Sequence, residues 1–146
     1  MTAVRTSLTI AASPERVWSV LTDFAAYPAW NSIISNVRTD LREGASFRFR
    51  IRIEAAPALA FSAKIVRCAP GRELSWRGGV PLVPALAHGH HYFRLAPVGD
   101  ATELTHGEDF GGLLDLVVRG SVHARITRTY DAFNRALKAR VEAGAA

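Results

Sequence analysis

The chain has 146 residues, 49% of them hydrophobic and 21% charged, and its 18 lysines and arginines exceed its 13 aspartates and glutamates, which gives a formal net charge of +5. This length and apolar content suit one globular domain, expected over residues 1–146, and exclude a disordered, collagen-like or coiled-coil chain. Because Cys68 is the only cysteine, no disulfide within the chain and no cysteine-based zinc site can form.

The sequence pattern of the N-terminal part predicts one strand followed by two short helices. Apolar and polar residues alternate from Val4 to Ile10, as in a strand with one buried face. Ser13 and Pro14 then provide a helix N-cap and a proline at the first helical position. Because Pro28 cannot sit comfortably inside this helix, residues 25–34 are predicted to form a second short helix or turn.

The middle of the chain predicts an antiparallel sheet. Apolar residues alternate with charged ones in residues 47–54, and the alternation returns in residues 59–65. A shorter strand around residues 74–76 follows a turn at Pro70-Gly71, and strands at about residues 86–96 and 102–110 flank a turn at residues 98–101. The loop at residues 78–85, GGVPLVPA, is unusually apolar for a surface connection and is expected to cover an opening.

The C-terminal part predicts one long amphipathic helix beyond Gly111-Gly112, with Gly120 as its only breaker. Its apolar stripe, at spacings of three and four, consists of Val122, Ile126, Tyr130, Phe133, Leu137 and Val141. One strand, two short helices, about six further strands and a long helix define an α+β fold. A sheet curved around a single helix buries that helix incompletely, so we expect a pocket between them.

Several segments, in one order along nearly the whole chain, resemble a known superfamily. They are residues 12–18 (ASPERVW), 22–24 (TDF), Tyr27 with Trp30-Asn31, and residues 74–79 (LSWRGG), 91–93 (HYF), 105–114 (THGEDFGGLL) and 133–138 (FNRALK). The chain is similar to the START-like, Bet v 1-like superfamily, and within it to the polyketide cyclase/dehydrase-type SRPBCC proteins. The resemblance implies a helix-grip fold, in which a curved seven-stranded antiparallel sheet wraps around the C-terminal helix and encloses a deep apolar pocket. It implies no particular reaction, because such proteins bind different lipids, hormones, polyketides or quinones.

The last predicted hairpin brings the strongest polar candidates together. If its turn is Gly99-Asp100, pairing outward from the turn places His91 opposite Glu108, on the inner face of the sheet. The same pairing places Phe93 opposite His106. An adjacent histidine and carboxylate can orient a ligand, act as acid and base, or form a hydrogen-bonded pair that only satisfies itself.

A set of side chains is predicted to line the pocket or its mouth and to bind a ligand. They are Trp30, Phe49, Phe61, Trp76, His91, Phe93, His106, Glu108, Phe110 and Tyr130. The candidate catalytic residues among them are His91, Glu108 and Tyr130. Core packing is the simpler explanation for each phenylalanine, but as a set the rings favour flat, apolar or aromatic ligands.

No metal or other cofactor is expected. The residues His88, His90, His91, His106 and Glu108 are of metal-ligand types. However, alternation along a strand directs His88 and His90 away from His91, so these positions do not converge on one ion. Gly78-Gly79 and Gly111-Gly112 are explained by turns at element boundaries, and no serine elbow or phosphate-binding loop is present.

A nucleic acid is not expected as a partner either. The row of Arg48, Arg50 and Arg52 is predicted to be the solvated face of the sheet, because no aromatic residue interleaves with it and no nucleic-acid motif is present. Weak contact with an anionic surface stays open, since the final helix is also rich in arginine. No apolar run suggests a signal peptide or a membrane segment, so a cytoplasmic protein is expected.

Three hypotheses for the function follow. The first is a protein that binds a small hydrophobic ligand, such as a lipid, polyketide or aromatic compound, as a monomer or homodimer. The second is an enzyme of the polyketide cyclase, aromatase or dehydratase type, in which His91, Glu108 or Tyr130 moves protons. The third is a protein-interaction module that uses the apolar loop at residues 80–86.

Overall fold

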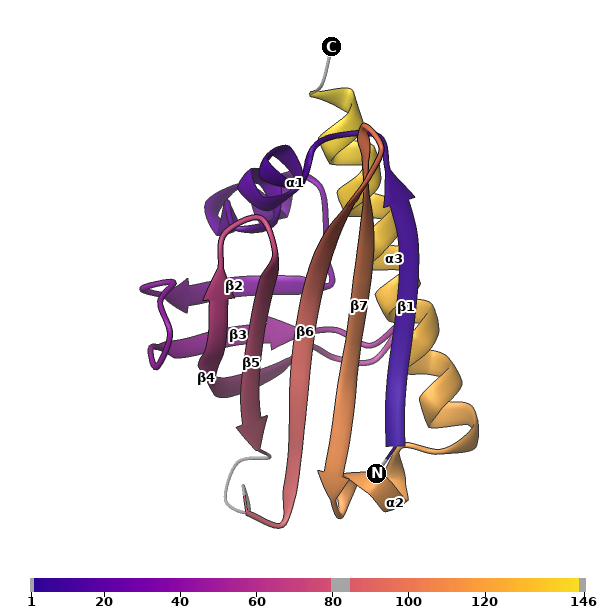
Figure 1. Cartoon of the computed structure of the whole chain (residues 1–146). Coiled ribbons are helices and arrows are strands. Elements are labelled where there is room, and N and C mark those ends of the chain that lie inside the picture. The colour runs from indigo at the N-terminus through magenta and orange to yellow at the C-terminus, as the bar shows by residue number, and fades with distance from the viewer. Residues whose placement is uncertain (1, 80–84, 145–146) are drawn as a thin grey trace.

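The computed structural model describes residues 2–79 and 85–144, which form a curved antiparallel sheet of seven strands and a long C-terminal helix (Figure 1). The predicted α+β, helix-grip architecture is therefore confirmed. The strands are β1 (Thr2–Ile10), β2 (Ile34–Thr39), β3 (Ser46–Ile51), β4 (Leu59–Ala69), β5 (Glu73–Gly79), β6 (Ala87–Val98) and β7 (Ala101–Gly112). The helices are α1 (Pro14–Leu21), the 3-10 helix η1 (Phe24–Ala29), α2 (Leu114–Val117) and α3 (Gly120–Ala143).

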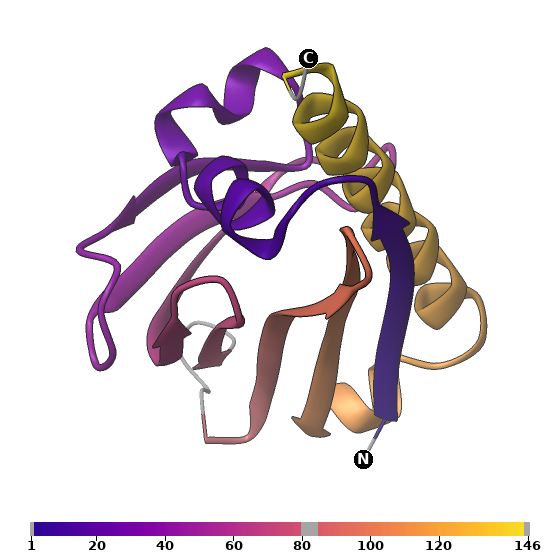
Figure 2. The same ribbon diagram turned by 45° about the horizontal axis from the view of Figure 1, so that its top comes forward.

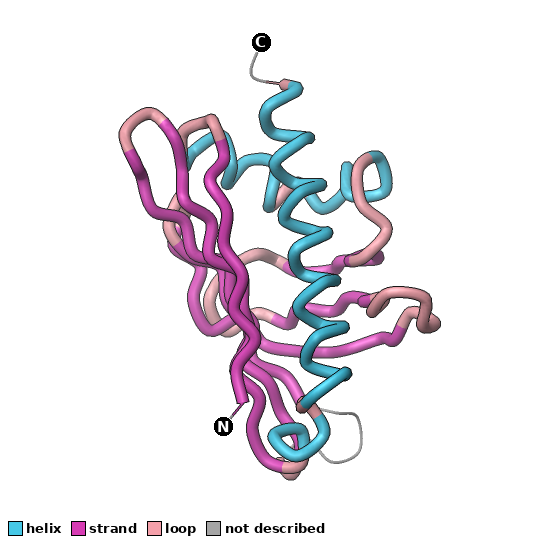
Figure 3. The backbone as a smooth tube through the Cα atoms, turned by 90° about the vertical axis from the view of Figure 1, so that its right-hand side faces the viewer, coloured by secondary structure: helices cyan, strands magenta, loops and turns pink. Residues whose placement is uncertain are grey.

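The sheet bends around α3. Its strand order is β1-β7-β6-β5-β4-β3-β2, and every neighbouring pair is antiparallel. In Figure 1, β2 and β3 run crosswise to β1, β6 and β7. Figures 2 and 3 show α3 lying along the concave side of this bent sheet, with α1 and η1 at one end and α2 at the other.

The first helix begins as its sequence predicts. Ser13 is in an extended conformation, and its hydroxyl accepts a hydrogen bond from the backbone N–H of Arg16 at 3.2 Å. Pro14 occupies the first turn, where its missing N–H costs nothing. The second short helix is η1, which contains Pro28. It ends earlier than predicted, and the strand β2 that begins at Ile34 completes the expected seven strands at a position that the sequence pattern did not identify.

The β6–β7 hairpin has the predicted register. Val98 pairs with Ala101 around the Gly99-Asp100 turn. Counting outward, Phe93 lies opposite His106 and His91 lies opposite Glu108. A two-residue turn determines every later pairing, and one residue more or less would have moved each side chain to the other face.

The C-terminal region differs from the single long helix that was predicted. A short helix, α2, ends at Val117, and α3 begins at Gly120 after an extended Arg119. Gly120 has a φ of 53°, a left-handed conformation that favours glycine. The break turns the chain between the two helices and leaves Val117 exposed.

The core is packed most densely at the α1 end of the molecule. The C-terminal half of α3 contributes Phe133, Leu137 and Val141, none of which is exposed to solvent. Leu21 of α1 and Tyr27 of η1 belong to the same apolar cluster. Among the described residues, an internal space is found at the α2 end, beside the first half of α3.

Two predicted surface features have different outcomes. The arginine row of β3, Arg48 and Arg50, is exposed on the outer face of the sheet, as expected, and so is Arg52 beyond it. Most of the apolar loop at residues 80–86 lies outside the described residues. Within the described ranges, none of the helices combines the length and the apolarity required to cross a membrane.

Candidate ligand cavity and its polar chain

A cavity of about 510 Å³ lies between the sheet and the elements α2 and α3. Its apolar lining side chains come from β3, β4, β5, β7, α2, α3 and the segments that flank them. They include Phe49, Ile51, Ile53, Leu59, Phe61, Ala63, Trp76, Phe110, Leu114, Val117, Val118, Val122 and Ile126. Leu59, Val117 and Val122 line the cavity and are also exposed to solvent, so they mark its mouth.

The space exists because small residues lie side by side on three neighbouring strands. Ala63 of β4 pairs with Gly78 of β5, and Gly78 pairs with Gly89 of β6. All three line the cavity, and Phe110 of β7 ends the row opposite Gly89. Gly78 and Gly79 are therefore strand residues beside the cavity, and their interpretation as a turn pair is wrong.

Seven of the residues predicted to contact a ligand line this cavity: Phe49, Phe61, Trp76, His91, Glu108, Phe110 and Tyr130. The other three lie elsewhere. Trp30 packs beside η1 against Tyr27 and Phe133, because the 3-10 helix holds it at the densely packed end. Phe93 and His106 are on the inner face as predicted, but they are covered by α3 and lie behind the cavity wall.

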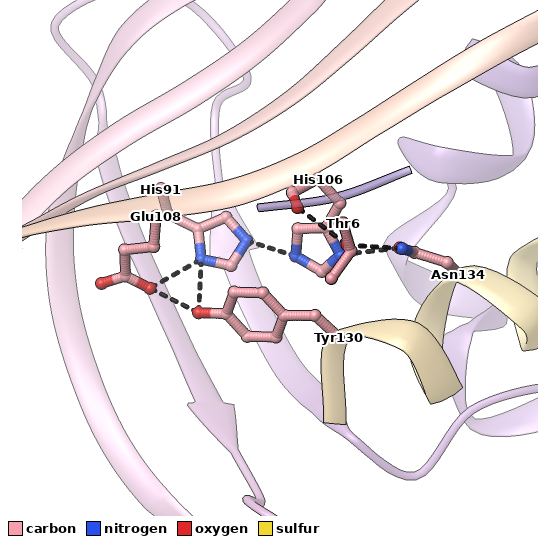
Figure 4. Close-up of polar contacts among 6 residues, drawn as sticks. All are labelled: Thr6, His91, His106, Glu108, Tyr130 and Asn134. Carbon is pink, nitrogen blue, oxygen red and sulfur yellow. Dashed lines mark hydrogen bonds and ion pairs between the residues drawn. The ribbon is translucent and has the colours of Figure 1, made fainter. Parts of the chain in front are cut away.

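Three polar side chains meet at the inner end of the cavity (Figure 4). The hydroxyl of Tyr130, on α3, donates a hydrogen bond to Glu108 Oε1 at 2.5 Å. His91 Nδ1 lies 3.1 Å from the same oxygen and 3.3 Å from the Tyr130 hydroxyl. Burial and the neighbouring Glu108 carboxylate raise the pKa of Tyr130 well above its usual value, so this phenol keeps its proton.

Behind this cluster, a chain of buried hydrogen bonds leads to the first strand (Figure 4). His91 Nε2 lies 2.8 Å from His106 Nε2, and His106 Nδ1 lies 2.7 Å from Asn134 Oδ1. Asn134 Nδ2 donates to Thr6 Oγ1 at 2.7 Å, and that hydroxyl donates to the backbone oxygen of His106 at 2.8 Å. We call these residues, from Glu108 to Thr6, the polar chain.

The direction of each hydrogen bond in the polar chain follows from its last member. The Thr6 hydroxyl must donate to a carbonyl oxygen, so it accepts from the amide nitrogen of Asn134. The amide oxygen of Asn134 therefore faces His106, whose Nδ1 must carry a hydrogen. Full burial is the main cause that lowers the pKa of His106 well below its usual value, and the neighbouring His91 lowers it further. The ring is therefore neutral, and its Nε2 is an acceptor.

The same logic determines the tautomer of His91. Because His106 Nε2 accepts, His91 Nε2 must be the donor. Its Nδ1 then faces Glu108 Oε1 across 3.1 Å, a contact that needs one more hydrogen between the two atoms. One hydrogen between these two atoms completes the row of hydrogen bonds that starts at Thr6.

Sequence reasoning missed two members of the polar chain. Asn134 lies four residues after Tyr130 and three before Leu137, so it belongs to the buried stripe of the helix, and an amide on such a stripe needs partners. Thr6 occupies the inward phase of the first strand, opposite His106. Both positions could have been noticed, but their contact depends on how α3 crosses β1.

The described residues hold no group of three or more histidine, cysteine, aspartate or glutamate side chains that could bind a metal ion. His88 and His90 alternate with His91 along β6 and are not among the cavity-lining residues of the described ranges. The polar end of the cavity consists of His91, Glu108 and Tyr130.

Three solved structures have the same architecture over nearly their whole length. TTHA0849 from Thermus thermophilus is 16% identical, with a TM-score of 0.75 over 99% of this chain and 100% of that one. The Zhui aromatase/cyclase from Streptomyces sp. R1128 is 20% identical, with a TM-score of 0.74 over 97% of this chain and 93% of that one. A START superfamily protein from Mycobacterium smegmatis is 24% identical, with a TM-score of 0.73 over 96% of this chain and 97% of that one.

These likenesses place the chain among proteins with the START-like, helix-grip fold. At the level of sequence, the profile of a family described as "Polyketide cyclase / dehydrase and lipid transport" matches residues 1–142. The chain belongs to this family, as its sequence motifs predict. No curated protein matches it significantly in sequence.

Proposed function

We propose that this protein binds one small hydrophobic ligand in the cavity between the sheet and the first half of α3. The observation that carries the proposal is the cavity itself, whose volume of about 510 Å³ lies in the range of small-molecule sites. Its walls are mostly apolar side chains, so burial of the ligand's apolar surface supplies most of the affinity. The family description, which includes lipid transport, supports the same function.

A pair of tryptophan substitutions tests this function. Ile126 is 9% exposed and lines the cavity, so Ile126→Trp fills part of the space. Leu116 is 65% exposed and is not among the lining residues, so Leu116→Trp is the matched control. We expect the neutral dye Nile red to bind the native protein and the control, and to bind the Ile126 variant at least about tenfold more weakly. Undiminished binding by a folded Ile126 variant would refute the proposal.

Proton transfer on a bound polyketide-like ligand is the second candidate function. It is favoured by the proton that His91 and Glu108 share at the wall of an apolar cavity, with the Tyr130 hydroxyl beside it. The similarity in fold to an aromatase/cyclase supports it as well. Under this function, His91→Ala and Glu108→Ala retain the binding of Nile red but abolish the turnover of a polyketide-like substrate. Under simple ligand binding, no turnover is measured with the native protein.

Three finer expectations stay predictions. The protein-interaction hypothesis depends on the loop at residues 80–86, most of which lies outside the described residues. A cytoplasmic location is supported by the single cysteine, Cys68, whose thiol is free. A monomer and a homodimer are both compatible with the fold, and light scattering on the purified protein distinguishes them.

A further inference from the structure

The polar end of the cavity offers a ligand an acceptor and no free donor. The Tyr130 hydroxyl already donates its hydrogen to Glu108 Oε1. His91 uses its Nε2 hydrogen on His106, and the remaining proton lies between His91 Nδ1 and the same Glu108 oxygen. Within the described parts of the chain, Glu108 Oε2 has no hydrogen-bond partner, and the Glu108 side chain keeps 18% of its surface exposed.

The position of Glu108 Oε2 follows from the glycine beneath it. A β-carbon on Gly89 would collide with this oxygen, so the carboxylate lies directly over the Gly89 backbone. Both residues line the cavity. The absence of a side chain at Gly89 thus lets the carboxylate lie against the sheet beside the ligand space.

The charged side chains around the cavity limit which ligand head groups it can bind. No lysine or arginine is among the lining residues that the structure describes. An anionic ligand head would therefore be buried next to Glu108 without a cationic partner, which is strongly unfavourable. An ammonium head would find a single acceptor there, Glu108 Oε2, because Oε1 already contacts Tyr130 and His91, so its other N–H groups would be buried unpaired.

We propose that the cavity selects an uncharged apolar ligand with a hydroxyl group, such as a phenol, an enol or an alcohol, whose O–H donates to Glu108 Oε2. Carboxylates and phosphates are rejected. The inference rests on the proposed ligand-binding function and specifies its substrate class. Aromatic ligands have an additional advantage, because the rings of Phe49, Phe61 and Phe110 form part of the wall.

Three matched naphthalenes test the donor requirement by displacement of Nile red at neutral pH. 2-Naphthol has the donor, 2-methoxynaphthalene lacks it, and 2-naphthoate adds a negative charge. A hydrogen bond to a charged or strongly polar acceptor corresponds to a preference of about tenfold or more, so we expect naphthol to bind at least about tenfold more tightly than its methyl ether. Naphthoate should bind most weakly.

Substitution of Glu108 tests whether its carboxylate is the acceptor that makes naphthol bind more tightly than its ether. Glu108→Met keeps an unbranched side chain of similar length without the acceptor, so the ratio of naphthol to ether affinity should fall to about one. Glu103→Met, at an exposed position of the same strand, is the control and should keep the native ratio. Retained binding of Nile red shows that each variant is folded.

The outcomes separate this inference from the function on which it rests. Equal affinities for naphthol and its ether in the native protein would overturn the donor requirement while ligand binding stands. Tightest binding of naphthoate would overturn the rejection of anions. If neither Nile red nor any naphthalene binds the native protein, the proposed ligand-binding function itself fails.

Discussion

Replacing Asn134 with leucine should move the hydrogen of His106 from Nδ1 to Nε2 and remove the Nε2 hydrogen of His91. The Asn134 amide oxygen is the reason that His106 Nδ1 carries its hydrogen. Without that acceptor, a hydrogen on Nδ1 would be buried and unpaired, at a cost of about 1–3 kcal/mol. Moving it to Nε2 avoids this cost, because His106 then donates to His91 Nε2. His91 releases its own Nε2 hydrogen to solvent and keeps the hydrogen on Nδ1 that faces Glu108 Oε1.

The size of the effect follows from the contacts that are lost. Leucine removes the two hydrogen bonds of Asn134, to His106 and to Thr6, each with a net contribution of about 0.5–1.5 kcal/mol. With the His106 hydrogen moved to Nε2, we expect the free energy of unfolding to fall by about 1–3 kcal/mol in urea denaturation. If the tautomers stayed as they are, the unpaired N–H of His106 would add a similar amount.

Nitrogen NMR of the imidazole rings measures the tautomers directly. In the native protein, His106 should carry its hydrogen on Nδ1 and accept at Nε2, and in Asn134→Leu these roles should exchange. Thr129→Val is the control, because Thr129 is also buried on α3 but, among the described residues, its hydroxyl bonds to the Arg125 backbone oxygen alone. A native His106 with its hydrogen on Nε2, or an unchanged pattern in the leucine variant, would refute the assigned direction of the polar chain.

Three further predictions concern stability. Because burial lowers the pKa of His106 below its ordinary 6.5, the stabilisation from its neutral ring is complete above about pH 6.5 and is lost as the pH falls, by up to about 1.4 kcal/mol per pH unit. Urea denaturation at pH 7 and pH 5.5 should show this loss, and His106→Phe should have a smaller one; an equal loss in both proteins contradicts the assignment. Gly89→Ala should destabilise the native protein by its collision with Glu108 but be nearly neutral in a Glu108→Ala background, whereas additive effects in this double-mutant cycle would argue against the contact. Phe133→Ala should cost about 3–5 kcal/mol, because the ring is fully buried in the dense part of the core. Val122→Ala, at the cavity mouth, should cost less than about 0.5 kcal/mol, and similar costs at both positions would contradict the uneven packing along α3.

The parts of the site that could be predicted are those that depend on local geometry. The pairing of His91 with Glu108 needs only a turn of known length and the period of two in each strand. The contact of Tyr130 with that pair is different, because it depends on where α3 crosses the sheet. Sequence periodicity identifies the buried stripe of a helix but not which strand residue lies opposite each of its members.

The two elements that were predicted wrongly contain breaks in periodicity. In β2, the register shifts between Ser35 and Arg38, and Asn36 has a φ of 53°, so the alternation that identifies a strand is interrupted in the middle. At the start of the last helix, Gly120 has the left-handed conformation that ends one helical path and begins another. In both places a single residue with positive φ outweighs the pattern around it.

The cavity is better explained by what its strands lack than by what they contain. Glycine inside a strand is unfavourable, because it has no side chain to pack and loses more entropy on folding. Gly78 and Gly89 nevertheless pair with each other, beside Ala63, on the inner face of the sheet. These three residues contribute few side-chain contacts to the core. The contacts that stabilise the fold lie at the other end of α3, where Phe133 and Leu137 are fully buried. A ligand that fills the cavity restores the missing contacts, so ligand binding should raise the stability of the whole fold by an amount that grows with the logarithm of the ratio of ligand concentration to Kd.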